Sequence, residues 1–286
     1  MRKPVRGLLL AAALSAGAAA VPAAAQESDV WQYAESAETC RATRSFDTAD
    51  GTTVLQLRSF GPDSAIELTV AGSEIAREPH AVRMVELGWD GEGYDRHQAG
   101  VLGTLGGVPS VSLLTQNRQV AAFGFFYSER AVLVSRLDPI AESMQLRVVG
   151  YAPKEVRVGT LAEPLRQLEA CEANLMEKWG WGRDYAQRVV TPPRMRDPQS
   201  WFFKAIVYPA VANLNRVSNL LQLRLKVDAR GRVAECVVQT SPGGSQFGSK
   251  NCSGLRRQAR FEPALDDQGQ PVESYFQMSI TFARYD

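Results

Sequence analysis

The sequence contains few of the residues from which metal and redox centres are built. Among 286 residues there are two histidines, His80 and His97, and four cysteines. None of the cysteines has another cysteine or a histidine close by in the sequence, as a zinc site would require. The two isolated histidines also offer little for a histidine-based catalytic triad. We therefore expect no metal site and no cofactor.

The chain also lacks a strong charge of either sign. Its 32 basic and 31 acidic residues leave a formal net charge of +1. Such a balance gives no long-range attraction to nucleic acid or to anionic lipid. With 45% hydrophobic and 22% charged residues, the composition is that of a globular protein long enough for two cores. We expect no nucleic-acid partner.

Catalytic and nucleotide-binding motifs are absent. The glycine-rich run Gly100–Gly106 lacks the spacing of a phosphate-binding loop, and we interpret it as a flexible loop between strands. The segment Gly243–Phe247 fails as a nucleophile elbow because Phe247 stands where the last glycine belongs. Asp90, Glu92 and Asp95 lack the alternating ligands of a calcium loop, so we expect a solvated hairpin tip there. The sequence thus predicts that the protein is not an enzyme.

Long apolar runs are missing except near the start of the chain. A basic stretch, Met1–Arg6, precedes the apolar run Gly7–Ala20 and the small residues Ala23–Ala25. This pattern predicts a signal peptide over residues 1–25, cleaved before Gln26. The apolar run is 14 residues long, shorter than the roughly 20 that span a bilayer. We expect a soluble periplasmic protein; the alternative is an uncleaved N-terminus that anchors the chain in the inner membrane.

The last eighty or so residues carry an ordered series of elements. Alternation of leucine and valine with polar residues over 221–227 indicates a half-buried strand. The turn signal Asp228–Gly231 follows, and then a second strand over 232–240. A helix start at Tyr208-Pro209 precedes the two strands, and a weak helical pattern over 247–259 follows them. The final strand, over 274–282, carries Phe276, Met278, Ile280 and Phe282 on one face. The order is therefore helix, strand, strand, helix, strand.

Four short motifs stand in a fixed order within this segment. They are Tyr208-Pro209, the Asp228-x-x-Gly231 turn, Arg260-Phe261-x-Pro263-Ala264, and the approach to the last strand, Asp267–Val272. Together they resemble the C-terminal domain of the TonB energy-transducer family, over about a quarter of the chain. The resemblance implies an α+β fold, with an α-β-β-α-β unit around a three-stranded antiparallel sheet.

The resemblance also implies a partner and a site. TonB C-terminal domains take an extended peptide of an outer-membrane receptor at the edge of the final strand. Here that edge strand would present its backbone and the side chains Tyr275, Gln277, Ser279 and Thr281. We expect β-strand addition to an outer-membrane transport partner, with a homodimer as a further possibility. The alternative is an envelope ligand-binding protein or enzyme whose activity lies in the N-terminal domain, with the TonB-like domain serving stability or dimerisation.

The cysteines fit an oxidising compartment, in which an even number usually forms disulfides. Cys236 and Cys252 both lie in the C-terminal unit, so pairing them keeps one bond within that unit. Cys40 and Cys171 then pair with each other and bracket the N-terminal region. Free buried thiols are the alternative.

Residues 28–190 are predicted to form a β-rich periplasmic domain that ends in a helix. Turn signals separate its strands, and Leu165, Leu168, Cys171 and Leu175 form an amphipathic stripe. Residues 191–200 contain three prolines and are predicted to be an extended linker to a C-terminal domain over 201–286. This short linker departs from the long proline-rich segment of the usual TonB pattern. The expected strands are 53–59, 65–71, 81–87, 108–115, 120–126 and 131–135.

Overall fold

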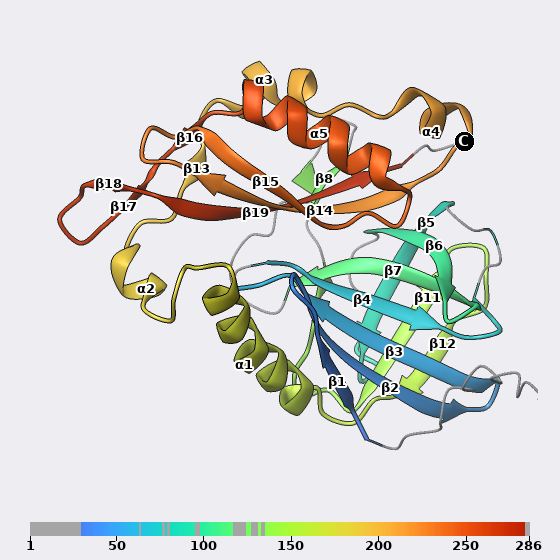
Figure 1. The fold of residues 1–286 in the computed structure, drawn as a ribbon. Helices are drawn as coiled ribbons and strands as arrows, with labels where there is room; N and C mark the ends of the chain where they lie inside the picture. The colour runs from blue at the N-terminus through green and yellow to red at the C-terminus, as the bar shows by residue number, and fades with distance from the viewer. Residues whose placement is uncertain are drawn as a thin grey trace, which may run out of the picture.

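A computed structural model of the protein describes residues 30–62, 64–75, 78, 81–94, 98–116, 124–126, 131–132 and 135–283. The predicted signal peptide lies outside the described residues, as do Asp95, His80 and His97. In the described part of the chain, the helices lack the length and apolar character that crossing a membrane requires. The chain combines helices with one large and several smaller sheets (Figure 1).

The N-terminal region is built on a ten-stranded sheet. Its hydrogen-bonded order is β1-β2-β3-β4-β7-β6-β5-β11-β12, antiparallel throughout, and β10 adds to β7 in parallel. Most strands expected from the sequence are present. The strands are β1 (Gln32–Glu35), β2 (Cys40–Thr48), β3 (Gly51–Ser59), β4 (Ile66–Ala71), β5 (Val82–Trp89), β6 (Gln98–Leu105), β7 (Val108–Gln116), β10 (Ser135–Arg136), β11 (Ser143–Val148) and β12 (Lys154–Arg157).

One prediction in this sheet was wrong. The run Gly100–Gly106 is mostly strand β6 and not a flexible loop. A Cβ atom on Gly100 would lie 2.5 Å from a Val85 methyl and 2.6 Å from a Val111 methyl. The glycine therefore makes room for valines of the two neighbouring strands, which local turn statistics do not reveal.

The large sheet curls until its two ends face each other. The Lys154 amino group of β12 lies 3.4 Å from Thr48 Oγ1 of β2. Leu55 and Leu68, from the neighbouring strands β3 and β4, share one buried apolar core with Val156 of β12 at the far end of the strand order. Helix α1 (Ala162–Lys178) adds Leu165, Leu168 and Leu175 to this core, as its apolar stripe predicts.

The C-terminal region has a second sheet of five strands in the order β15-β14-β19-β8-β9. Asp228 and Gly231 close the β14–β15 hairpin, and the Asp228 carboxylate accepts the amides of Arg230 and Arg232. Gly231 is required because its φ is 74° and a Cβ there would meet Phe261 O at 1.9 Å. The strands are β14 (Asn219–Val227), β15 (Val233–Thr240), β19 (Ser274–Phe282), β8 (Gly124–Phe126) and β9 (Ala131–Val132).

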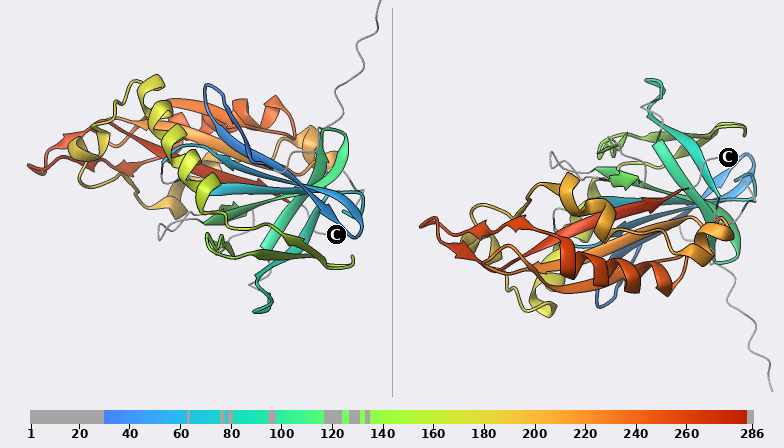
Figure 2. Two further views of the ribbon diagram at one scale, coloured as in Figure 1. Left: turned by 90° about the horizontal axis from the view of Figure 1, so that it is seen from below. Right: turned by 90° about the horizontal axis from the view of Figure 1, so that it is seen from above.

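Helices cover one face of this second sheet, and the N-terminal region covers the other (Figure 1). The helix side is held by a core that includes Phe247, Phe261 and Phe282. The remaining elements are α2 (Tyr185–Arg188), β13 (Arg194–Met195), α3 (Pro198–Ala205), α4 (Ala210–Leu214), α5 (Ser245–Gln258), β16 (Phe261–Glu262), β17 (Ala264–Leu265) and β18 (Pro271–Val272). The β17–β18 hairpin projects from the body in both views of Figure 2.

Both disulfides join the cysteine pairs expected from the sequence. Cys40 of β2 bonds Cys171 of α1, and Cys236 of β15 bonds Cys252 of α5. In the segment between the two sheets, β13 pairs with β16, and Val190 and Thr191 both donate their amides to Leu265 O. This proline-rich segment is therefore fastened along the C-terminal sheet elements.

Candidate functional site

The final strand β19 is the candidate site, and its apolar face belongs to the core. β19 pairs with β14 in antiparallel register from Asn219↔Phe282 to Val227↔Ser274. Met278, Ile280 and Phe282 are buried in the core beneath the helices, and Phe276 packs against that core. These are the four side chains that the sequence assigned to the inner face.

The opposite face of β19 is covered and not solvated. Tyr275, Ser279 and Thr281 are buried, and Gln277 is half-buried. Their alternation with apolar residues is typical of a solvent-facing surface, so the sequence predicted that a visiting strand would meet these side chains. That prediction was wrong for the side chains, because the N-terminal region lies against them.

An ion pair between buried Arg224 and half-buried Glu38 joins the two regions across this face. Arg224 of β14 donates to both carboxylate oxygens of Glu38, at 2.9 and 3.2 Å. The Arg224 guanidinium also lies 4.3 Å from the ring centroid of Trp179, and its side chain is only 9% exposed. A bidentate pair stacked on an aromatic ring fixes orientation as well as charge.

The loop at Phe60 is held by two glutamines of the C-terminal sheet. Gln239 of β15 and Gln277 of β19 both donate to Phe60 O, at 2.8 and 2.7 Å. The next residue, Gly61, has a φ of 119°, and a Cβ there would lie 2.5 Å from the Trp179 ring. The space beside the Trp179 ring accommodates glycine and no larger residue, which indicates a closely packed junction.

An aromatic cluster fixes the start of β19. The Tyr275 ring lies 4.9 Å from that of Tyr185, 6.1 Å from Trp181 and 6.2 Å from Trp179. The Tyr275 backbone amide donates to the Tyr185 hydroxyl at 3.4 Å, and the Tyr275 hydroxyl donates to Pro62 O at 3.3 Å. These contacts bring the end of the N-terminal region onto the outer edge of the strand.

At the other end of β19, the outer edge is already paired. β8 runs parallel to it with Ser279↔Gly124, Ile280↔Phe125 and Thr281↔Phe126 as partners. β9 then pairs with β8 in antiparallel register. The prediction that the final strand ends at a sheet edge was therefore wrong over residues 279–281. The sequence placed a strand near 120–126, but nothing in its periodicity shows which sheet the strand joins.

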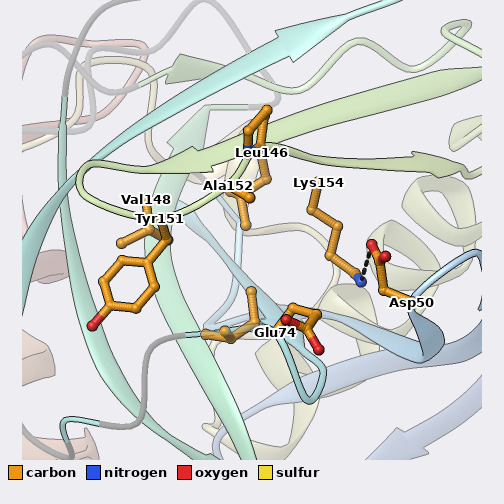
Figure 3. A pocket seen from close by; sticks show the side chains of 9 residues that line it. Asp50, Glu74, Leu146, Val148, Tyr151, Ala152 and Lys154 are labelled. Carbon is orange, nitrogen blue, oxygen red and sulfur yellow. Dashed lines mark ion pairs between the residues drawn. The ribbon is translucent and has the colours of Figure 1, made fainter.

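A separate cavity of about 150 Å³ lies in the N-terminal region, between β12 and the β2–β3 turn (Figure 3). Lys154 points into it, with its side chain 6% exposed and its amino group 3.8 Å from the Asp50 carboxylate. Thr48 Oγ1 is a second partner at 3.4 Å. Because the ammonium is paired with groups of its own domain, this cavity is a weaker candidate than β19. Among the described residues no cluster of ligating side chains could hold a metal ion.

The C-terminal unit is a helix-covered sheet whose last strand pairs at its outer edge with β8, a segment from a distant part of the chain. Residues 204–283 match the family described as Gram-negative bacterial TonB protein C-terminal. The match covers this part of the chain and leaves the N-terminal region outside it. No curated protein matches the chain.

The residues that sequence reasoning missed are Glu38, the Phe60 loop and Arg224. Arg224 alternates with leucines in a strand, which is also the pattern of an exposed residue. A signal was available only in the aromatic side chains near the linker, since large aromatics there often cover one domain with another.

Proposed function

We propose that this is a TonB-like protein of the cell envelope whose C-terminal domain binds an extended segment of an outer-membrane transport protein. The segment adds as a strand to the outer edge of β19. Strand addition supplies main-chain hydrogen bonds to amide and carbonyl groups that a sheet edge would otherwise leave unpaired. The family match over residues 204–283 supports both the partner class and the compartment.

One observation carries the proposal: the outer edge of β19 takes β8 in parallel pairing. The backbone at residues 279–281 thus has the geometry that an added strand needs. Tyr275, Gln277, Ser279 and Thr281 remain the proposed site residues, but through their backbone groups. Their side chains hold the strand against the N-terminal region.

The test is a proline at Gln277, compared with an alanine at the same position. Proline removes the amide and disturbs the backbone that a strand must follow, so Gln277→Pro should abolish capture of outer-membrane protein. Gln277→Ala keeps the amide and loses only the side-chain bond to Phe60 O, so it should retain capture. Tyr275→Ala should only weaken it. Normal capture by a folded Gln277→Pro protein would remove β19 as the site.

A second candidate function follows from the extent of the junction. The N-terminal region packs against the C-terminal sheet through the Arg224–Glu38 pair and the Tyr275 cluster. In this alternative the TonB-like domain stabilises an N-terminal domain that binds the ligand. A small molecule that binds the full chain and is not displaced by outer-membrane protein would favour it.

A further inference from the structure

The hairpin strands β8 and β9 belong to a different sheet from the strands on either side of them in sequence. β7 ends at Gln116 and β10 begins at Ser135, and both lie in the ten-stranded sheet of the N-terminal region. Between them, residues 124–126 and 131–132 extend the C-terminal sheet instead. The N-terminal region thus contributes an extended segment to the sheet of the TonB C-terminal domain.

This segment occupies the edge at which strand addition would occur. β8 covers residues 279–281 of β19, and the Tyr185 hydroxyl meets the amide of Tyr275 near the strand's beginning. Between these points Gln277 is held through its side chain to Phe60 O. The outer edge of β19 is therefore engaged at both ends by groups of the same chain.

We propose that β8 is an internal occupant of the acceptor edge, and that an incoming strand binds by displacing it. This inference rests on the proposed function of β19. The pairing covers only three residues and is parallel, the slightly weaker arrangement per residue, so a longer extended peptide gains more hydrogen bonds than it displaces.

The cost to an incoming peptide comes from tethering. A segment held on short connections has an effective concentration on the order of millimolar at its site. A free peptide then binds only the fraction of molecules in which β8 has left, and its apparent dissociation constant rises accordingly. The free protein is thereby held in a low-affinity state, while a long or locally concentrated partner segment still binds.

The experiment uses the mature full-length chain and, as probe, a fluorescent synthetic peptide with the sequence of residues 121–130. Phe125→Pro breaks the β8 pairing, because proline cannot maintain a ladder position at which a donor is needed. Fluorescence anisotropy should show at least a roughly ten-fold tighter binding of the probe to Phe125→Pro than to the wild type. The matched control, Phe125→Ala, keeps the amide and should bind as weakly as the wild type. Equal binding of the probe to all three proteins would overturn the inference.

Hydrogen exchange gives a second measurement, and its wild-type part needs no variant. In the wild type, at least one amide of Ser279–Thr281 beyond those bonded to β14 should exchange slowly. Phe125→Pro should increase the exchange rate of that amide and leave the exchange rates of the amides bonded to β14 unchanged. Fast exchange of every outer-edge amide in the wild type would overturn the inference without recourse to any substitution.

The failure of this inference is distinguishable from failure of the proposed function. Suppose that Phe125→Pro binds the probe more tightly than the wild type does, but no variant captures outer-membrane protein. Then β8 occupies the edge and the proposed partner is wrong. Suppose instead that the wild type and Phe125→Pro capture outer-membrane protein equally and bind the probe equally weakly. Then the edge is functional and β8 does not occupy it.

Discussion

At the scale of single residues, the junction between the two regions depends on hydrogen bonds and an ion pair between polar side chains and groups of the other region. Arg224 is buried, and its guanidinium donates to both carboxylate oxygens of Glu38. Removing Glu38 should destabilise the protein, because the Arg224 charge would then stay buried without its carboxylate partner. Contacts with the N-terminal region thus contribute to the stability of the outward face of the sheet.

A second buried charge gives a prediction about pH. Glu67 of β4 is 6% exposed, with Arg58 Nη1 3.6 Å from its carboxylate. Burial raises the pKa of Glu67, and the nearby Arg58 charge offsets only part of that rise. The folded state therefore binds the proton more tightly than the unfolded state. The stability that this group contributes is present at acid pH and is lost as pH rises through the folded-state pKa.

Glu67→Gln should accordingly increase the free energy of unfolding relative to the wild type at pH 8, and this gain should shrink toward pH 4.5. Glutamine keeps the shape and removes the buried charge. Chemical denaturation at a series of pH values measures the difference, with Glu155→Gln, at an exposed position of β12, as the control. A destabilisation by Glu67→Gln that grows with pH would show that the ion pair with Arg58 outweighs desolvation.

At the scale of elements, the C-terminal domain follows closely from its local sequence. Leucine–polar alternation, the Asp228–Gly231 turn and the Phe276–Phe282 pattern predicted strands that the structure contains. The prediction failed where a contact between distant segments decides the outcome. Gly100 lies in a strand at which valines of the two neighbouring strands leave no room for a larger side chain. Strand β8 joins β19 across more than 150 residues of sequence.

For a similar reason, the sequence did not show that the N-terminal region covers the polar face of β19. Gln277, Ser279 and Thr281 are polar, and polar side chains suit either solvent or a hydrogen-bonded interface. Only the position of Phe60 O, 2.7 Å from Gln277 Nε2, distinguishes the two. Periodicity shows that a face is polar and leaves open what lies against it.

The disulfide between β15 and α5 gives a prediction at this scale. It closes a loop with a sequence separation of 16, for which the chain-entropy estimate is about 3 kcal/mol. Replacing Cys236 and Cys252 together by serine should lower the free energy of unfolding by about 2–4 kcal/mol and leave the N-terminal domain folded. Chemical denaturation followed by circular dichroism measures the change. An unchanged denaturation midpoint would show that the unfolded chain does not gain the expected freedom.

At the scale of the whole molecule, the two regions form one continuous body through two apolar contacts besides the polar ones. Leu220 of β14 packs with Val82, Val101 and Leu114 of the large sheet, and Tyr275 packs with Met176 and Trp181. The N-terminal region therefore has a direct structural role at the proposed binding edge. A partner that reaches β19 must change these contacts or the β8 pairing.

The compartment is tested on the whole chain. If residues 1–25 are a signal peptide, intact mass spectrometry of the periplasmic fraction should find a protein that begins at Gln26. The expectation rests on the short apolar run and the small residues before Gln26. Full-length chain in the membrane fraction would contradict it and indicate an anchored protein.

The measurement that tests the central claim most directly is quantitative capture of outer-membrane protein by three mature full-length proteins. These are the wild type, Gln277→Pro and Phe125→Pro, each verified as folded by circular dichroism. If strand addition at β19 is the binding event and β8 competes for it, capture should be highest for Phe125→Pro, intermediate for the wild type and at background for Gln277→Pro. Equal capture by all three proteins would contradict the account.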